Sequence, residues 1–68
     1  MNTNEIKAGQ NLVNVLPSGT RLPVVAIEDI GDGMWRVTEA RNWGKASVKQ
    51  LIARGKTYGC PVANLSAA

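Results

Sequence analysis

The chain has 68 residues, with 8 Lys or Arg, 5 Asp or Glu, no His and one Cys, which gives a formal net charge of +3. This length allows a single domain that buries only about 60% of the surface its unfolded chain would expose. The composition excludes an internal disulfide and leaves too few ligands for a structural zinc site, so we expect neither a metal nor a cofactor.

The lone Cys60 fits a reducing, cytoplasmic compartment. Because no His is present to activate its thiol, we interpret it as a half-buried structural residue. Residues 1 to 9 are mostly polar, with Ile6 as the expected anchor. They are predicted to form a flexible tail before a single domain over residues 10 to 66.

The N-terminal residues lack a basic region followed by an apolar stretch, so they do not indicate a signal peptide. The longest apolar run, VVAI at residues 24 to 27, is far shorter than the roughly 20 residues that span a bilayer. We therefore expect a cytoplasmic protein without a membrane partner. The small size suits an accessory protein of a phage or plasmid.

Three strands are predicted in the first part of the chain. The first, NLVNVL at residues 11 to 16, stops at a PSGT turn. The second, LPVVAIEDI at residues 22 to 30, has Pro23 near its start, where a missing backbone donor is tolerated. GDG at residues 31 to 33 then favours a tight hairpin into MWRVTEA at residues 34 to 40.

Alternation along the third strand places Trp35 and Val37 on one face, where Trp35 is expected in the core. The other face then carries Met34, Arg36 and Thr38.

The next segment is predicted to be a short helix over residues 48 to 54. Ser47 and Gln50 have the spacing of a capping box, and Gly55 stands where a helix ends. Alternation over the same residues leaves a strand as the rival interpretation. CPVANL at residues 60 to 65 is predicted to be a short closing strand, followed by a tail. The apolar face of the helix would consist of Val48, Leu51 and Ile52.

Three segments resemble the SH3-like barrels of the KOW and Tudor-like kind: AGQNLVNVL, GTRLPVVAIEDIGDGMWRVTEA and CPVANL. The resemblance covers about residues 9 to 40 and 60 to 65, and implies a mainly β, SH3-like antiparallel mini-barrel with one short helix. Closing such a barrel would remove exposed sheet edges. Residues 42 to 56 depart from the family, whose connection here is one turn. SVKQLIARGKTYGCPV, at residues 47 to 62, resembles instead the recognition helix and wing of excisionase and MerR-like winged-helix proteins.

The acidic residues Glu28, Asp29 and Asp32 cluster in the predicted hairpin, where we expect them to make side-chain to backbone turn bonds. No phosphate-binding loop, dinucleotide motif or Ser/His/Asp set is present, so an enzyme is not expected. YGCPVANL resembles the tail of the plasmid-borne dihydrofolate reductases, SH3-like barrels with an active site at the oligomer centre. It lacks their Gln-Ile-Tyr stretch before the proline.

Charge is divided unevenly along the chain. Residues 1 to 39 hold three basic and five acidic residues, whereas residues 40 to 68 hold five basic residues and no acidic one. Clustered Lys and Arg provide most of the non-specific affinity for nucleic acid. A solvated structural face and a surface for an acidic protein partner remain alternatives. The five basic residues, which could share one side of the domain, are Arg41, Lys45, Lys49, Arg54 and Lys56.

Trp43 stands in a polar loop, where it could stack on a base, anchor a protein interface or cover a small core. The sequence thus predicts a non-enzymatic module that binds nucleic acid, DNA or RNA. The alternative is a protein-interaction module that modulates a host or partner protein through Trp43, and a homo-oligomer is compatible with either. The predicted nucleic-acid-binding residues are Arg36, Arg41, Trp43, Lys45, Lys49, Arg54, Lys56 and Tyr58.

Overall fold

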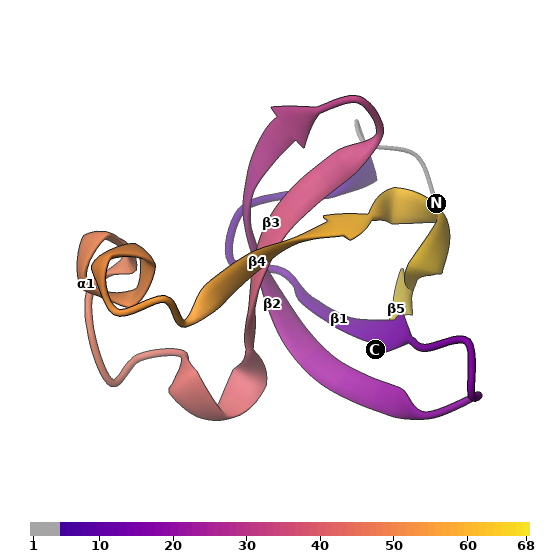
Figure 1. Ribbon diagram of the computed structural model, residues 1–68, viewed down its shortest axis with the longest axis horizontal. Helices are drawn as coiled ribbons and strands as arrows, with labels where there is room; N and C mark the ends of the chain where they lie inside the picture. Colours follow the sequence, from indigo (N-terminus) through magenta and orange to yellow (C-terminus); the bar gives the residue numbers. More distant parts are fainter. Residues whose placement is uncertain (1–4) are drawn as a thin grey trace.

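The computed structural model describes residues 5 to 68, which form one antiparallel sheet of five strands in the order β4-β3-β2-β1-β5 (Figure 1). This is the mainly β fold with one short helix expected of an SH3-like mini-barrel. The sheet is strongly curved but does not close, since β4 and β5 remain its two edges. The elements are β1 (Asn11–Val15), β2 (Arg21–Gly31), β3 (Met34–Glu39), the 3-10 turn η2 (Ala40–Asn42), α1 (Val48–Ala53), β4 (Thr57–Pro61), the 3-10 turn η3 (Val62–Asn64) and β5 (Leu65–Ala67).

The hydrophobic core lies on the concave face of the sheet, where alternate residues of neighbouring strands meet. Trp35 belongs to it and is only 6% exposed, as predicted. Cys60 is not half-buried but fully buried, because its register with Trp35 on β3 directs it into the same core. The buried core residues are Ile6, Leu12, Val24, Ala26, Trp35, Val37, Cys60, Val62 and Leu65.

The flexible tail predicted over residues 1 to 9 falls partly on residues 1 to 4, outside the described residues. In the remainder, Ile6 is buried in the core and the backbone N–H of Gly9 donates to the carbonyl of Ala26 at 2.8 Å. The packing of the domain therefore includes residues before position 10.

The β2–β3 hairpin forms as predicted. Its two-residue turn consists of Asp32 and Gly33, both with positive φ (56° and 72°), the conformation that matches the twist of paired strands. Oδ1 of Asp29 accepts a hydrogen bond from the backbone N–H of Gly31 at 2.8 Å, which confirms a turn-bonding role for this carboxylate.

The C-terminal strand prediction is wrong in its bounds. Residues 60 and 61 end β4, which begins at Thr57 and pairs with β3, while residues 62 to 64 form η3. The closing strand β5 follows and extends through the predicted tail to pair with β1. The ladder reaches one residue beyond Pro61, since the backbone N–H of Val62 donates to the carbonyl of Gly33 at 2.8 Å, and η3 then leads the chain to β1.

The helix prediction is confirmed, and the rival strand is excluded. The Ser47 Oγ accepts from the backbone N–H of Gln50 at 3.1 Å, while the Gln50 Oε1 accepts from the backbone N–H of Ser47 at 3.0 Å. Together these bonds form the predicted capping box. Leu51 is buried, but Ile52 is 40% exposed, so the apolar face of α1 is narrower than predicted.

The β3–β4 connection, which contains η2 and α1, extends to one side of the sheet (Figure 1). Val25 and Thr38 pair in register and face away from the core, yet both are at most 1% exposed. Thr38 Oγ1 donates to the carbonyl of Lys56 at 2.8 Å, and Leu51 is also buried. The connection is thereby fixed against the outer face of β2 and β3.

Candidate functional site

Two adjoining hollows lie where β3 ends, β4 begins and β2 begins. The register of Val24 with Glu39 places Glu39 on the core side of the sheet, just beyond the packed interior. The larger one, here called the basic hollow, has a volume of about 460 Å³. It is lined by Glu39, Arg41, Asn42, Lys45, Gly55, Lys56, Thr57 and Tyr58.

Arg41 and Glu39 form an ion pair at the edge of this hollow. The Arg41 Nε donates to Glu39 Oε2 at 2.6 Å, with side chains 79% and 28% exposed respectively. This bond uses one of the five N–H donors of the guanidinium. Arg41 is therefore oriented by the protein and still presents most of its donors to solvent.

Hydrogen bonds of the main chain fix the backbone at the other two basic residues of the basic hollow, Lys45 and Lys56. The Lys45 N–H donates to the carbonyl of Asn42 at 3.4 Å, in the turn that follows η2. The Lys56 N–H donates to the carbonyl of Leu51 at 2.9 Å, while its own carbonyl accepts from Thr38. Both lysines are exposed. With Glu39 as the only acidic lining residue, the formal charge of the lining is +2.

Tyr58 forms a rigid wall of the basic hollow. It packs against the core, and its hydroxyl accepts a hydrogen bond from Nδ2 of Asn14 at 3.1 Å. Asn14 lies on β1, so this bond joins β4 to β1 across the concave side of the open sheet. Tyr58, one of the residues predicted to bind nucleic acid, is thus held in place as a wall of the basic hollow.

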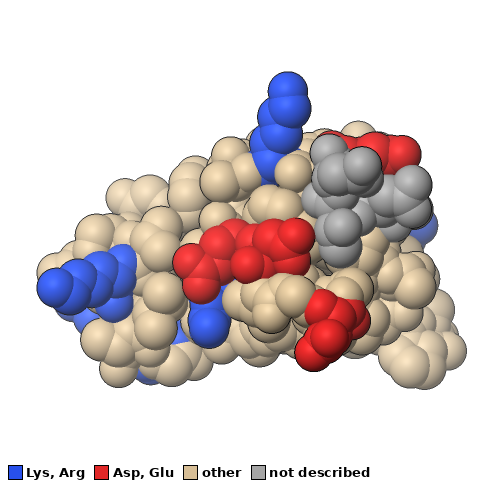
Figure 2. Space-filling model, turned by 90° about the horizontal axis from the view of Figure 1, so that it is seen from above, with Lys and Arg blue, Asp and Glu red and all other residues tan. Residues whose placement is uncertain are grey.

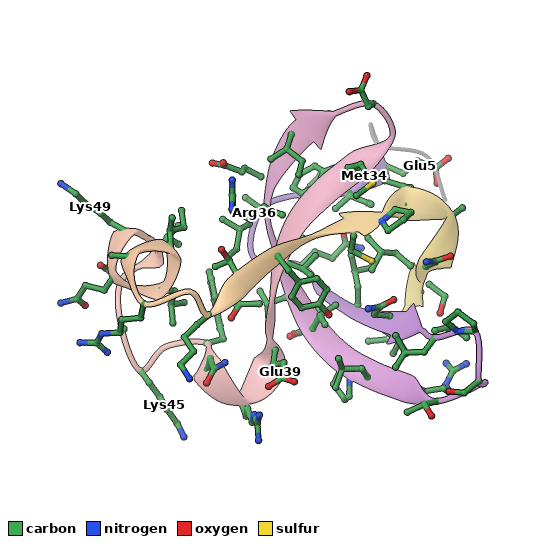
Figure 3. All side chains as sticks on the ribbon, in the orientation of Figure 1. Glu5, Met34, Arg36, Glu39, Lys45 and Lys49 are labelled. Atoms are coloured by element: carbon green, nitrogen blue, oxygen red, sulfur yellow. The ribbon has the colours of Figure 1, made fainter. Side chains whose placement is uncertain are left out.

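The remaining predicted residues lie elsewhere. Arg36 pairs with Glu28 at 3.2 Å and also donates to the Thr57 hydroxyl at 3.3 Å. Figure 3 shows Lys45 and Lys49 directed to opposite sides of the molecule, with Arg36 on the side of Lys49 and Glu39 on the side of Lys45.

Neither Arg54, the C-terminal cap of α1, nor the 41% exposed Trp43 lines either hollow. The five cations of residues 40 to 68 therefore do not share one face, and the structure brings three of them together. Acidic side chains gather in the centre of the face seen in Figure 2, with few basic ones beside them.

The second, apolar hollow has a volume of about 300 Å³ and adjoins the first, since Glu39 and Arg41 line both. Its other lining residues are Leu22, Pro23 and Ala40. This hollow was not predicted from the sequence, and neither were four residues of the basic hollow: Glu39, Asn42, Gly55 and Thr57. The strand register that places Glu39 beside the cations has no signature in the local sequence.

Burial raises the pKa of the Cys60 thiol, which makes it a poorer nucleophile. Across residues 5 to 68, no group of three or more metal-ligating side chains comes together. In the same part of the chain, no helix has the length and apolar character needed to span a membrane. Comparison of the chain with protein-family models, curated proteins and solved structures gives no match.

Proposed function

We propose that this chain is a non-enzymatic module that binds single-stranded nucleic acid in the basic hollow. One observation carries the proposal: Arg41, Lys45 and Lys56 converge on one concavity whose sole carboxylate, Glu39, is already paired. Phosphates that replace counterions around such clustered cations supply most non-specific nucleic-acid affinity.

The shape of the site favours a single strand over a duplex. A flexible strand can bend its backbone into a hollow and follow a basic surface. A duplex is stiff over far longer distances and presents a convex surface. Asn42 and Thr57 add neutral hydrogen-bonding groups to the same lining. Glu28, Asp29 and Asp32, which lie near the turn of the β2–β3 hairpin, do not line the basic hollow, so they do not oppose a phosphate there.

The test is the affinity for a labelled single-stranded oligonucleotide of mixed sequence, measured by fluorescence anisotropy at two salt concentrations. A single strand loses affinity with a log–log slope of about −0.7 for each phosphate neutralised. Three contacts predict a slope of about −2, which is roughly a twentyfold loss between about 50 and 200 mM salt. Absence of binding at the lower concentration would refute the proposal.

A second candidate is protein docking through the β3–β4 connection. Trp43 and Ile52 are 41% and 40% exposed on this connection, and exposed aromatic residues often anchor interfaces. This candidate predicts no nucleic-acid binding at low salt, with a partner association that is insensitive to salt and lost on Trp43→Ala.

A cytoplasmic location belongs to the same proposal. Cys60 is free and buried, which suits a compartment that keeps thiols reduced.

A further inference from the structure

We infer that the apolar hollow holds a base of the bound strand and prefers bases with an exocyclic amino group over thymine or uracil. This inference rests on the proposed function, because it places the base of a nucleotide whose phosphate lies in the basic hollow. The two hollows are contiguous through Glu39 and Arg41, so one nucleotide can reach both.

The walls of the apolar hollow suit the face of a base. Leu22 packs against the core and is therefore fixed, while Pro23 and Ala40 add rigid or short apolar side chains. Bases taken out of a stack are held between apolar or aromatic side chains and against arginine planes. Arg41 is 79% exposed and restrained only through Nε, so its guanidinium plane is available at the edge.

Glu39 is the residue that distinguishes between the bases. Its ionised carboxylate can only accept hydrogen bonds. Oε2 accepts the bond from Arg41, which leaves Oε1 to accept one from a ligand. The amino groups of cytosine and adenine donate hydrogen bonds, whereas the one ring donor of thymine, N3–H, lies between two carbonyl oxygens that a carboxylate repels. Because the side chain of Glu39 is only 28% exposed, water replaces a lost partner less easily there.

The experiment compares oligo(dC), oligo(dA) and oligo(dT) of equal length at one salt concentration, with the full chain and two variants. Glu39→Gln removes the charge at the hollows. The matched control, Glu28→Gln, removes the carboxylate that pairs with Arg36 and changes the net charge equally.

We expect the wild type to bind oligo(dC) and oligo(dA) about tenfold more tightly than oligo(dT), as a hydrogen bond to a charged group would give. Glu39→Gln should bring this ratio close to one, because it removes both the charged acceptor that favours the amino groups and the negative charge that opposes oligo(dT). Glu28→Gln should keep the ratio.

Equal affinity of the wild type for all three strands, or a preference that survives Glu39→Gln, would overturn the inference while leaving phosphate binding intact. Failure to bind any strand would remove the proposed function as well.

Discussion

Replacing Thr38 with Val tests how the β3–β4 connection is held in place. Thr38 is fully buried, and its hydroxyl donates to the carbonyl of Lys56 at 2.8 Å. Valine preserves the shape but leaves that carbonyl without its donor, which costs about 1 kcal/mol. In a domain of this size, such a loss lowers Tm by roughly 4 to 8 °C. It is also a substantial part of a total stability of about 3 to 10 kcal/mol.

The assay is urea unfolding followed by tryptophan fluorescence, since Trp35 is buried in the core. Thr20→Val is the matched control, because the Thr20 hydroxyl interacts only with Ser18 in an exposed turn. We expect the control to stay within about 0.5 kcal/mol of wild type. Thr38→Val should also weaken oligonucleotide binding, because Lys56 loses its anchor. Unchanged stability, or lost stability with undiminished affinity, would contradict this role of Thr38.

Three further predictions concern stability. Ser47→Ala removes the capping box of α1 and should cost about 1 kcal/mol in urea unfolding, whereas an unchanged midpoint would contradict the role of the cap. Gly33→Ala should lower the free energy of unfolding by about 1 kcal/mol, because a φ of 72° is unfavourable for a residue with a Cβ. The added Cβ meets no atom within 4 Å, so no steric clash adds to this loss. The raised pKa of Cys60 means that above pH 9.0 the unfolded chain ionises while the folded chain keeps its proton, so stability falls as pH rises. Cys60→Val should show a smaller fall over that pH range in parallel unfolding curves, and identical curves would exclude a contribution from the thiol.

Features that depend on local sequence were predictable. The glycines around Asp32 specify the β2–β3 turn, and the pairing of Ser47 with Gln50 specifies where α1 begins. In both cases, a few neighbouring residues determine the backbone conformation. The boundary between β4 and β5 was not predictable in this way, because residues 60 to 65 have strand-like composition throughout. The 3-10 turn η3 within them has no sequence signature.

The candidate site was predictable in its charge but not in its geometry. The basic excess after residue 39 is visible in the sequence. Lys45 and Lys49, however, point to opposite sides because Lys45 precedes the helix and Lys49 lies within it. Arg36 was predicted to belong to the site. It lies opposite Glu28 in the hairpin register and forms an ion pair with it, outside the basic hollow. The direction of each basic side chain depends on strand pairing and on the position of the helix in the fold, and no local sequence pattern encodes either.

The most direct test of the account compares two double variants by the salt dependence of single-stranded oligonucleotide binding. One removes cations of the basic hollow, Lys45→Gln with Lys56→Gln, and the other removes cations outside it, Lys49→Gln with Arg54→Gln. Both lower the net charge by the same amount. If the strand binds in the basic hollow, the first pair reduces the log–log slope from about −2 to about −0.7, while the second pair leaves it unchanged. Equal effects of the two pairs would show that the strand responds to overall charge, and would contradict a site in the basic hollow.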